Sequence, residues 1–265
     1  MKNIKKSFKL VFALILVLAL TAGCSKTADA PEQPKDGISS ELVLGLDDTF
    51  APMGFRNEKG EIVGFDIDLA KEAAKRMNVT IKLQPIDWSM KESELDAGNI
   101  DFIWNGYTVT EERKEKVGFT TPYLENSQLI ITMKDSNINT KSDLAGKMVA
   151  VQAESSALDA IKAEGDIASS FKELVEFSTN NEAFIDLESG RTDAIVVDGV
   201  LARYYMKQKG DNNYKVLKED FGDEEYAVGL RKGDTELLDK LNKAFDEMKK
   251  DGTYDKIYSK WFSEN

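Results

Sequence analysis

Residues 65–104 read FDIDLAKEAAKRMNVTIKLQPIDWSMKESELDAGNIDFIW, a stretch in which helical and strand-like periods alternate. A helix is predicted over residues 65–77, with Asp66 able to cap its start, because apolar side chains recur on one face. These side chains are Leu69, Ala70, Ala73, Ala74 and Met77. A strand over 79–85, a helix over 91–97 ended by Gly98, and a strand over 101–104 follow. Such alternation is typical of α/β folds with parallel strands.

The alternation continues on both sides of this stretch. Further strands are predicted over residues 41–46, 128–133, 148–151, 193–197 and 226–230. Further helices are predicted over 155–163, 181–188, 201–209 and 234–250, with a last helix carrying Tyr254, Ile257, Tyr258 and Trp261. The sequence therefore predicts an α/β fold over nearly all of the chain after residue 40.

Composition excludes several function classes. The 265 residues include 35 Lys and Arg against 47 Asp and Glu, so the formal net charge is −12, which argues against nucleic-acid binding. The chain contains no His and one Cys, which excludes His-based catalysis, an intrachain disulfide and sites built from His or several Cys ligands. We therefore expect no cofactor and no metal.

The amino terminus has the pattern of an exported protein. Four lysines within the first nine residues precede 11 consecutive apolar residues, too few to span a bilayer comfortably, as in a signal peptide. The sequence LTAGC that ends at Cys24 resembles the bacterial lipobox, so we expect a signal peptide over 1–23 and lipid (palmitate) on Cys24. Residues 24–40 are polar and predict a flexible tether. The alternative is an ordinary signal peptide with a chance cysteine.

Short motifs follow one another in a distinctive order. They are DDTFAP (47–52), GFDIDL (64–69), IDW (86–88), GNID (98–101), TVTEER (108–113), FTTPY (119–123), DLAGK (143–147), GRTDA (190–194) with Asp198, and VGLRK (228–232). In this order they resemble the polar amino-acid-binding proteins of ABC importers, extracellular solute-binding family 3. The resemblance covers about residues 41–261.

The resemblance implies a two-lobed fold of the type II periplasmic binding proteins. Lobe 1 would comprise residues 41–126 plus 223–265, and lobe 2 would comprise residues 127–222. Two crossover strands would form a hinge, and the ligand would bind in the cleft between the lobes.

The resemblance assigns the ligand's carboxylate to Arg113, whose guanidinium pairs with carboxylates through two parallel hydrogen bonds. The alternative is a solvated arginine in the charged run 111–116. Gly106 and Thr108 match positions that meet the ligand, although a plain loop is the alternative. Ser155 and Ser156 begin a helix, where free N–H groups favour an anion, and a simple cap is compatible with that role.

Asp198 matches the aspartate that binds the ligand's ammonium group. It follows a buried-type strand at its carboxyl end, where α/β sheets place ligands. The alternative, a cap for the helix over 201–209, is equally compatible with the bare sequence. Phe50 and Trp88 match the aromatic pair that sandwiches the ligand's side chain, with core packing as the alternative.

Asp47 matches an acidic position that contacts the distal end of polar ligand side chains, and Asn105 and Gln152 match other variable positions of the pocket. Asp47 favours a cationic or polar ligand, whereas the two amides also suit glutamine. Glu154 departs from the family, which often has glycine there, so a positive φ at this position would be strained. Trp104 is a second unusual residue, because a large aromatic side chain stands just before the cleft loop. Its side chain either narrows the pocket or fills the core.

These features favour a receptor and not an enzyme. We expect a monomeric lipoprotein, lipid-anchored outside the cytoplasmic membrane, that binds a polar amino acid and delivers it to an ABC permease. Arginine, lysine, glutamine and cystine all remain open as ligands, and so do the permease and the envelope type. The alternative function is a cyclohexadienyl-dehydratase-like enzyme on the same fold, in which Asp47, Glu154 or Asp198 would act as acid or base.

Overall fold

Two five-stranded sheets and one three-stranded sheet form the framework of a computed structural model that describes residues 37–263. These residues belong to one compact unit that spans residues 34–265. The predicted signal peptide, Cys24 and most of the tether lie outside the described residues.

The first sheet has the strand order β5-β1-β6-β13-β7. Its parallel part comprises β1 (Glu41–Leu46), β5 (Thr80–Pro85) and β6 (Phe102–Ile103). β13 (Gly229–Leu230) lies between β6 and β7 (Gly118–Phe119) and is antiparallel to both. A strand from late in the chain therefore joins the middle of this sheet to its edge.

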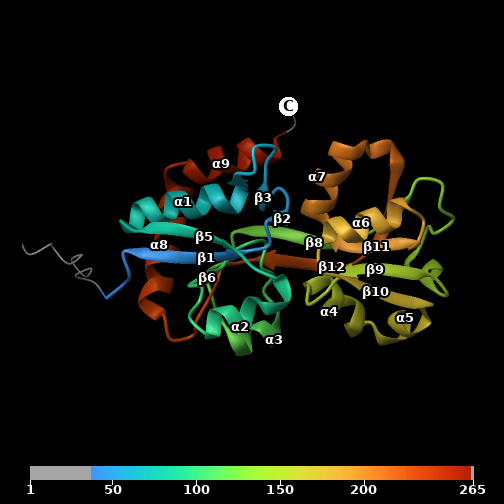
Figure 1. Cartoon of the computed structure of the whole chain (residues 1–265), viewed down its shortest axis with the longest axis horizontal. Helices are drawn as coiled ribbons and strands as arrows, with labels where there is room; N and C mark the ends of the chain where they lie inside the picture. The colour runs from blue at the N-terminus through green and yellow to red at the C-terminus, as the bar shows by residue number, and fades with distance from the viewer. Residues whose placement is uncertain (1–36, 264–265) are drawn as a thin grey trace, which may run out of the picture. The chain divides into compact units, whose positions relative to one another are not determined.

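Helices cover both faces of the first sheet. Figure 1 shows α1 (Phe65–Met77) and α9 (Thr253–Phe262) on one side, and α2 (Lys91–Asp96) and α3 (Glu111–Lys116) on the other. The long helix α8 (Thr235–Lys250) packs against α1 and α9 through a buried apolar face. Burial of this face excludes water from a core that includes Leu241 and Phe245.

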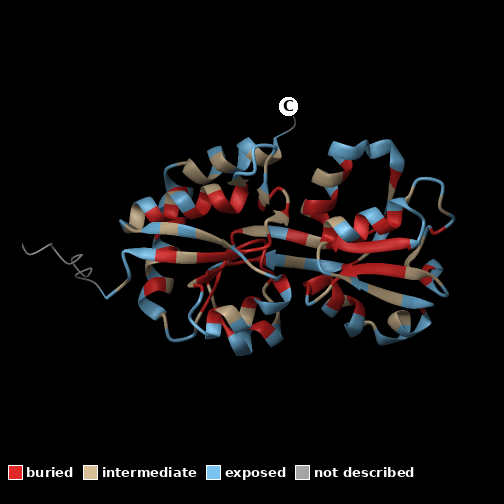
Figure 2. Cartoon of the chain, in the orientation of Figure 1, coloured by how far each residue is buried: buried red, intermediate tan, exposed pale blue. Residues whose placement is uncertain are grey.

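The second sheet has the strand order β10-β9-β11-β8-β12. β9 (Met148–Gln152) is parallel to β10 (Glu173–Phe177) and to β11 (Ala194–Asp198). β8 (Leu124–Met133) is antiparallel to both β11 and β12 (Tyr214–Tyr226). α4 (Ser156–Ala163) and α5 (Gly165–Ser170) cover one face, and α6 (Asn180–Glu188) and α7 (Gly199–Lys209) cover the other (Figure 1). Figure 2 shows β11 buried throughout, as expected for a strand covered on both faces.

The remaining elements are short. A small antiparallel sheet combines β2 (Thr49–Phe50), β3 (Gly54–Arg56) and β4 (Ile62–Val63). Single 3₁₀ turns cover η1 (Trp88–Met90), η2 (Lys141–Leu144) and η3 (Asp211–Asn213).

The chain passes between the two large sheets twice, from β7 to β8 and from β12 back to β13. The two passages lie next to each other, because β8 and β12 are paired where they begin and end, with Leu124 opposite Tyr226. The two crossover strands expected from the sequence are therefore present.

Several expectations need correction. The strands are not all parallel, since β8, β12, β13 and β7 have antiparallel partners. The single strand expected over 226–230 is two elements, because Tyr226 ends β12 in one sheet and Gly229 begins β13 in the other. Asp66 does not cap α1: Gly64 occupies the N-cap position, and no side chain caps this end by a hydrogen bond.

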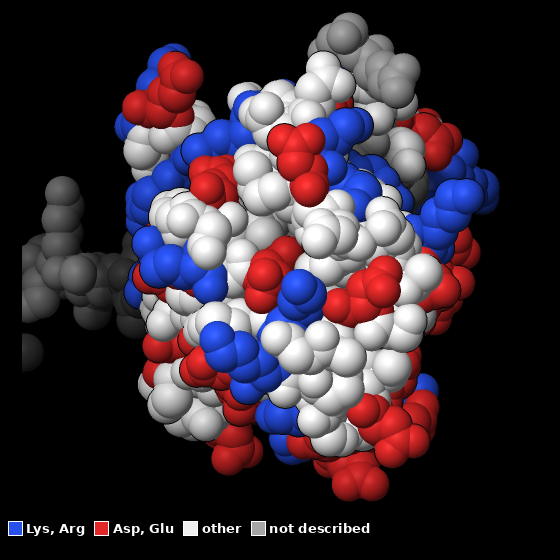
Figure 3. Space-filling model, turned by 90° about the vertical axis from the view of Figure 1, so that its right-hand side faces the viewer, with Lys and Arg blue, Asp and Glu red and all other residues white. Residues whose placement is uncertain are grey.

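Charged side chains of both signs are interspersed on the face shown in Figure 3, over the end of the molecule that lies at the right of Figure 1. Within residues 37–263, none of the helices combines the length and the apolar character that crossing a membrane would require.

Candidate functional site

All eleven residues expected to bind a ligand are buried, although eight of them have ionisable, amide or hydroxyl side chains. They are Asp47, Phe50, Trp88, Asn105, Gly106, Thr108, Arg113, Gln152, Ser155, Ser156 and Asp198. They come from the loop after β1 and from β2, from η1, from the loop after β6, from α3, from the end of β9 and the start of α4, and from the end of β11. Buried polar groups need partners, and the partners of this set connect segments of the two sheets.

Arg113 lies on α3, with 5% of its surface exposed. Its guanidinium donates to the carbonyl of Thr108 at 3.1 Å and to the carbonyl of Glu154 at 3.3 Å. It also lies 4.7 Å from the centre of the Tyr107 ring and 4.0 Å from a carboxylate oxygen of Glu92. The alternative of a solvated arginine is therefore wrong.

A chain of hydrogen bonds connects the Arg113 side of the site with Asp198. The Thr108 and Ser156 hydroxyls lie 3.0 Å apart, which joins the loop after β6 to the start of α4. Gln128 Nε2 then donates to Ser156 Oγ and to Asp198 Oδ1, at 3.2 Å each. The residues expected to meet opposite ends of an amino acid thus belong to one connected polar network.

Asp198 ends β11, and its side chain accepts hydrogen bonds from Asn126, Gln128 and the Tyr226 hydroxyl. It occupies the N-cap position of α7, but it makes no capping hydrogen bond, so the alternative reading as a side-chain cap is wrong. Burial raises the pKa of Asp198 well above its usual range, and the nearby Glu224 carboxylate raises it further. A cation beside this carboxyl would favour its ionised form.

Asp47 and Gln152 meet across the site. Gln152 Nε2 donates to Asp47 Oδ2 at 2.9 Å, and Gln152 Oε1 accepts from Asn180 at 2.8 Å. The other Asp47 oxygen accepts from the Thr49 amide and hydroxyl, while Asn105 Oδ1 accepts from the Asp47 amide. Burial raises the pKa of Asp47, and the bonds from Thr49 and Gln152 oppose this shift.

The aromatic pair flanks this polar network. Phe50 belongs to the main core cluster, and a Cβ on Gly106 would lie 2.9 Å from its ring. Gly106 has a φ of 59°, in the left-handed region that favours glycine. Trp88 packs edge-on against Tyr107 at 6.0 Å, in a separate cluster. Core packing therefore describes both aromatic residues as they stand.

The turn between β9 and α4 combines a cap with an unusual backbone. Ser155 Oγ accepts from the Leu158 amide at 3.2 Å, so Ser155 caps α4 as one reading predicted. Glu154 has a φ of 53°, so the position does require the conformation in which a non-glycine residue is strained. Trp104, the other unusual residue, is fully buried against Phe102, Tyr123 and Phe245 and fills the core.

The structure adds residues that the sequence reasoning missed. Lys91, Glu92 and Tyr107 surround Arg113, and Asn126, Gln128, Glu224 and Tyr226 surround Asp198. Lys91 and Glu92 look like ordinary surface residues of a short helix, so their spacing carried no signal. Asn126 and Gln128 lie on one face of β8, but Glu125 and Ser127 on the other face are polar too, so the sequence did not distinguish them.

Asp66 supports the site from within the first sheet's core. Its Oδ2 accepts from the Gly106 amide at 2.7 Å and from the Tyr123 hydroxyl at 2.9 Å, while its Oδ1 has no partner. Complete burial raises the pKa of this carboxyl to about 7. Asp66 therefore fixes the loop that carries Gly106.

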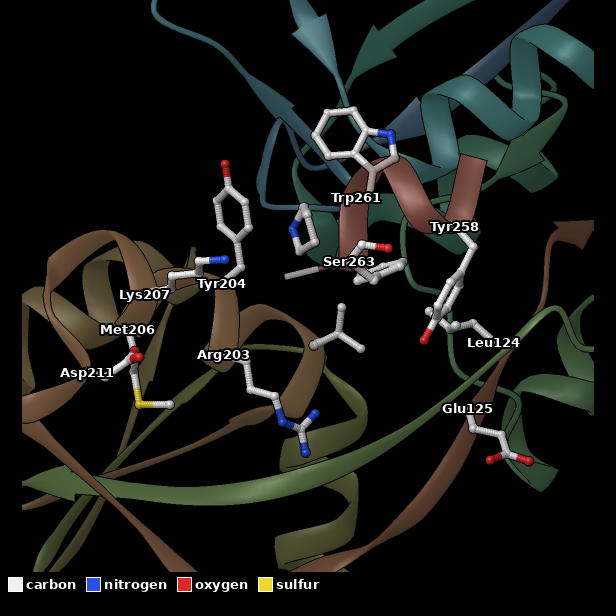
Figure 4. A pocket seen from close by; sticks show the side chains of 13 residues that line it. Leu124, Glu125, Arg203, Tyr204, Met206, Lys207, Asp211, Tyr258, Trp261 and Ser263 are labelled. Atoms are coloured by element: carbon white, nitrogen blue, oxygen red, sulfur yellow. The ribbon is translucent and has the colours of Figure 1, made fainter. Parts of the chain in front are cut away.

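A groove of about 760 Å³ lies elsewhere, and none of the eleven expected residues lines it. Figure 4 shows Arg203, Tyr204 and Lys207 on one helix, α7, with Tyr258 and Trp261 of α9 across the groove. The groove is open and mixed in character, whereas the expected site is buried and its polar side chains are linked by hydrogen bonds, although Asn105 Nδ2 and Gln128 Oε1 have no partner. The buried network is therefore the candidate functional site. Within residues 37–263, no three acidic side chains are arranged to hold a metal ion.

Two α/β sheets joined by two adjacent crossovers, with a buried polar network contributed by both, define the type II periplasmic binding protein fold. The chain belongs to the bacterial extracellular solute-binding proteins, family 3, whose model matches residues 42–264. The name of the family describes extracellular proteins, so this class is extracytoplasmic.

Named relatives of this chain bind amino acids. The histidine-binding periplasmic protein of Escherichia coli (strain K12) is 36% identical over 264 residues, covering 96% of each chain. The L-cystine-binding protein TcyJ of the same organism is 32% identical over 252 residues, covering 94% of this chain and 93% of TcyJ. These relatives are named for binding and not for catalysis.

A solved structure extends the similarity to three dimensions. It is an ABC uptake transporter substrate-binding protein from Streptococcus pneumoniae with bound histidine. The TM-score is 0.83 and the identity is 43%, over 85% of this chain and 93% of the other.

Proposed function

We propose that this protein is a lipid-anchored extracytoplasmic receptor that binds a polar amino acid and delivers it to an ABC importer. One observation carries the proposal: Arg113, Thr108, Ser156, Gln128 and Asp198 form a single buried chain of hydrogen-bonding groups. A free amino acid carries both a carboxylate and an ammonium group. A site with a buried guanidinium at one end and a buried carboxylate at the other matches both charges.

The assignment of ligand groups follows from this charge arrangement. Arg113 would pair with the carboxylate, assisted by Gly106, Thr108, Ser155 and Ser156. Asp198 would pair with the ammonium group. Phe50 and Trp88 would flank the side chain, whose distal end would meet Asp47, Asn105 and Gln152. A polar side chain is favoured because Asp47 and Gln152 both offer hydrogen-bonding groups there.

The two-lobe assignment belongs to the same proposal. Lobe 1 would comprise residues 41–126 plus 223–265, and lobe 2 would comprise 127–222. These boundaries fall within β8 and β12, the strands next to the two passages between the sheets. A hinge at this place would open the site for entry and close it over the ligand. We propose that the closed monomer is the form that the permease recognises.

The experiment is a thermal-shift screen of purified protein that has been unfolded and refolded to remove any ligand. The probes are the common amino acids, with L-cystine and L-ornithine added. A ligand that binds the native state alone raises the melting temperature according to its concentration over its Kd. A shift confined to one chemical group of amino acids supports the proposal and identifies the substrate class. A refolded protein that responds to none of them would overturn it.

Lipid anchoring needs its own test, because Cys24 lies outside the described residues. Intact-mass analysis of the membrane-extracted protein should give a chain that begins at Cys24 and carries acyl mass. The Cys24→Ser variant should lose this mass and leave the membrane fraction. Release of the wild-type chain as an unmodified protein would contradict the anchor.

A further inference from the structure

Lys91 is a buried cation next to the expected carboxylate site. Only 2% of its surface is exposed, although lysine is almost never fully buried unless its charge is paired. Its Nζ donates to the carbonyl of Glu154 at 2.9 Å and lies 3.2 Å from a Glu92 carboxylate oxygen. The Trp88 ring covers it at 5.3 Å. Lys91 therefore connects the start of α2 with the turn between β9 and α4.

Arg113 converges on the same atom. Its guanidinium donates to the Glu154 carbonyl at 3.3 Å, so two cations from the first sheet's part of the chain share one acceptor from the second. The acceptor belongs to the residue whose φ is 53°. Because this strained turn leads directly into Ser155 and Ser156, its position decides where the start of α4 lies.

The charges at this corner do not balance. Lys91 and Arg113 are both buried, while Glu92 is the carboxylate that contacts both, at 3.2 and 4.0 Å. The Glu154 side chain is exposed, and so are Asp87, Glu112 and Asp159, which act on the corner only from further away. An uncompensated buried charge is costly, so this corner favours the arrival of one more anion.

We propose that Lys91 is a second cation of the carboxylate subsite, which positions the Glu154 turn over the ligand's carboxylate together with Arg113. This inference rests on the proposed function, since it assumes an amino-acid ligand at Arg113. Lys91 acts through the Glu154 carbonyl and through its charge, and it is a positioning residue. The sequence resemblance assigned no role to it.

The first test compares Lys91→Met with Lys91→Arg and with Lys114→Met. Methionine keeps an unbranched apolar stem but removes the charge and its donors, whereas arginine keeps both. Lys114 lies on the same helix as Arg113 and is exposed, so it is the matched control. The probes are L-arginine, L-histidine, L-glutamine and L-cystine, together with L-argininamide and L-histidinamide, which lack the carboxylate.

We expect Lys91→Met to weaken the binding of the amino acids about tenfold, as the loss of a charged hydrogen bond predicts. The loss should be much smaller for the two amides, and Lys91→Arg should restore most of it. A residue that only stabilises the fold would affect acids and amides alike. An unchanged Kd in Lys91→Met, or an equal loss for acids and amides, overturns the inference.

The pH profile gives a second readout. Burial lowers the pKa of the Lys91 amine, and the neighbouring Arg113 lowers it further. Affinity that depends on the charged amine is present below this lowered pKa and is lost as the pH rises through it. The ligand's ammonium group also titrates in alkali, so the ratio of Kd between Lys91→Met and wild type is the quantity to follow. This ratio should fall towards one as the pH rises, and a constant ratio contradicts the inference.

A measurement on the wild-type protein covers the case in which the variants do not fold. The side-chain ¹³C signal of Lys91 should titrate at higher pH with a bound amino acid than without it, because the carboxylate favours the charged amine. An unchanged titration overturns the inference. If the wild-type protein binds none of the four amino acids, the proposed function fails instead, and the two failures are thus distinct.

Discussion

Arg113 is the residue on which every amino-acid ligand would depend. We expect Arg113→Ala to weaken the affinity for every amino-acid probe about a hundredfold, because the ligand's carboxylate would remain buried without the guanidinium that pairs with it. Isothermal titration with L-arginine, L-glutamine and L-histidine measures the change. Lys116→Ala is the control, since Lys116 is an exposed residue of the same helix. A loss confined to one amino acid would place Arg113 at the side-chain end of the ligand instead.

Asp47 should control selectivity. In Asp47→Asn the side-chain oxygen can still accept from the amide and hydroxyl of Thr49, while the negative charge and the acceptor for Gln152 are lost. We expect the ratio of affinities for L-arginine and L-glutamine to fall by about tenfold. Parallel titrations of the two ligands, with the melting temperature as a check on folding, test this. An equal change for both ligands would mean that Asp47 is structural.

Asp66 should make stability depend on pH. Its pKa is raised to about 7 in the folded protein, from 3.8 for an ordinary aspartate, so the folded state holds a proton that the unfolded state has lost. Between these pKa values the free energy of unfolding therefore falls as the pH rises, by about 4 kcal/mol at most.

The Asp66→Asn variant removes this contribution but keeps an acceptor for Gly106 and Tyr123. Urea unfolding at a series of pH values should show the wild type losing stability relative to the variant from about pH 4 to about pH 7. Asp198 remains in both proteins, so its own raised pKa cancels in the difference. A difference that does not vary with pH would mean that Asp66 is ionised in the fold.

At the scale of elements, the turn from β9 to α4 stores backbone strain. Glu154→Gly keeps the carbonyl that Lys91 and Arg113 share and removes the side chain that disfavours a φ of 53°. We expect a gain of about 1 kcal/mol in the free energy of unfolding, with little change in ligand affinity. Asn78→Gly is the control: Asn78 also has a positive φ, of 55°, but asparagine tolerates this region better. A loss of stability in Glu154→Gly would mean that the Glu154 side chain makes a stabilising contribution.

Helices and strands whose apolar residues recur with a clear period were predictable from the sequence. Elements whose formation depends on contacts with distant parts of the chain were not. α1 has the bounds that its apolar spacing predicted, and β1 does too. β12 was missed because its sequence, YKVLKEDFGDEEY, is highly charged, as an edge strand with exposed positions can be. The sequence predicted one strand that includes both Tyr226 and Gly229, because residues 227–228 contain no glycine, proline or other turn residue to show that the chain changes sheets there.

The candidate site was predictable only through its motifs. Arg113 stands in a charged run, and its burial follows from contacts with residues up to 41 positions away. The family resemblance assigned Arg113 to the site, which the spacing of residues along the sequence could not do. It did not supply Lys91 or Glu224, because their side chains matter through neighbours that the fold alone brings together.

At the scale of the whole molecule, the two adjacent passages between the sheets predict a hinge. Ligand binding should reduce the radius of gyration in small-angle X-ray scattering, because the proposed lobes close on the ligand. The refolded, ligand-free protein is the reference, and Arg113→Ala with the same added amino acid is the control. Identical scattering with and without a saturating ligand would contradict closure by a hinge.

The order of strands also has a consequence for biogenesis. β13, at residues 229–230, lies between β6 and β7, so the first sheet cannot be completed until more than four-fifths of the chain is present. Four of the five strands of the second sheet, β8 to β11, lie within residues 124–198 and are neighbours in its strand order, so they become available earlier. During export from the amino terminus, we therefore expect the middle of the chain to fold first. The first sheet would be completed later, when β13 has been translocated and can pair with β6 and β7.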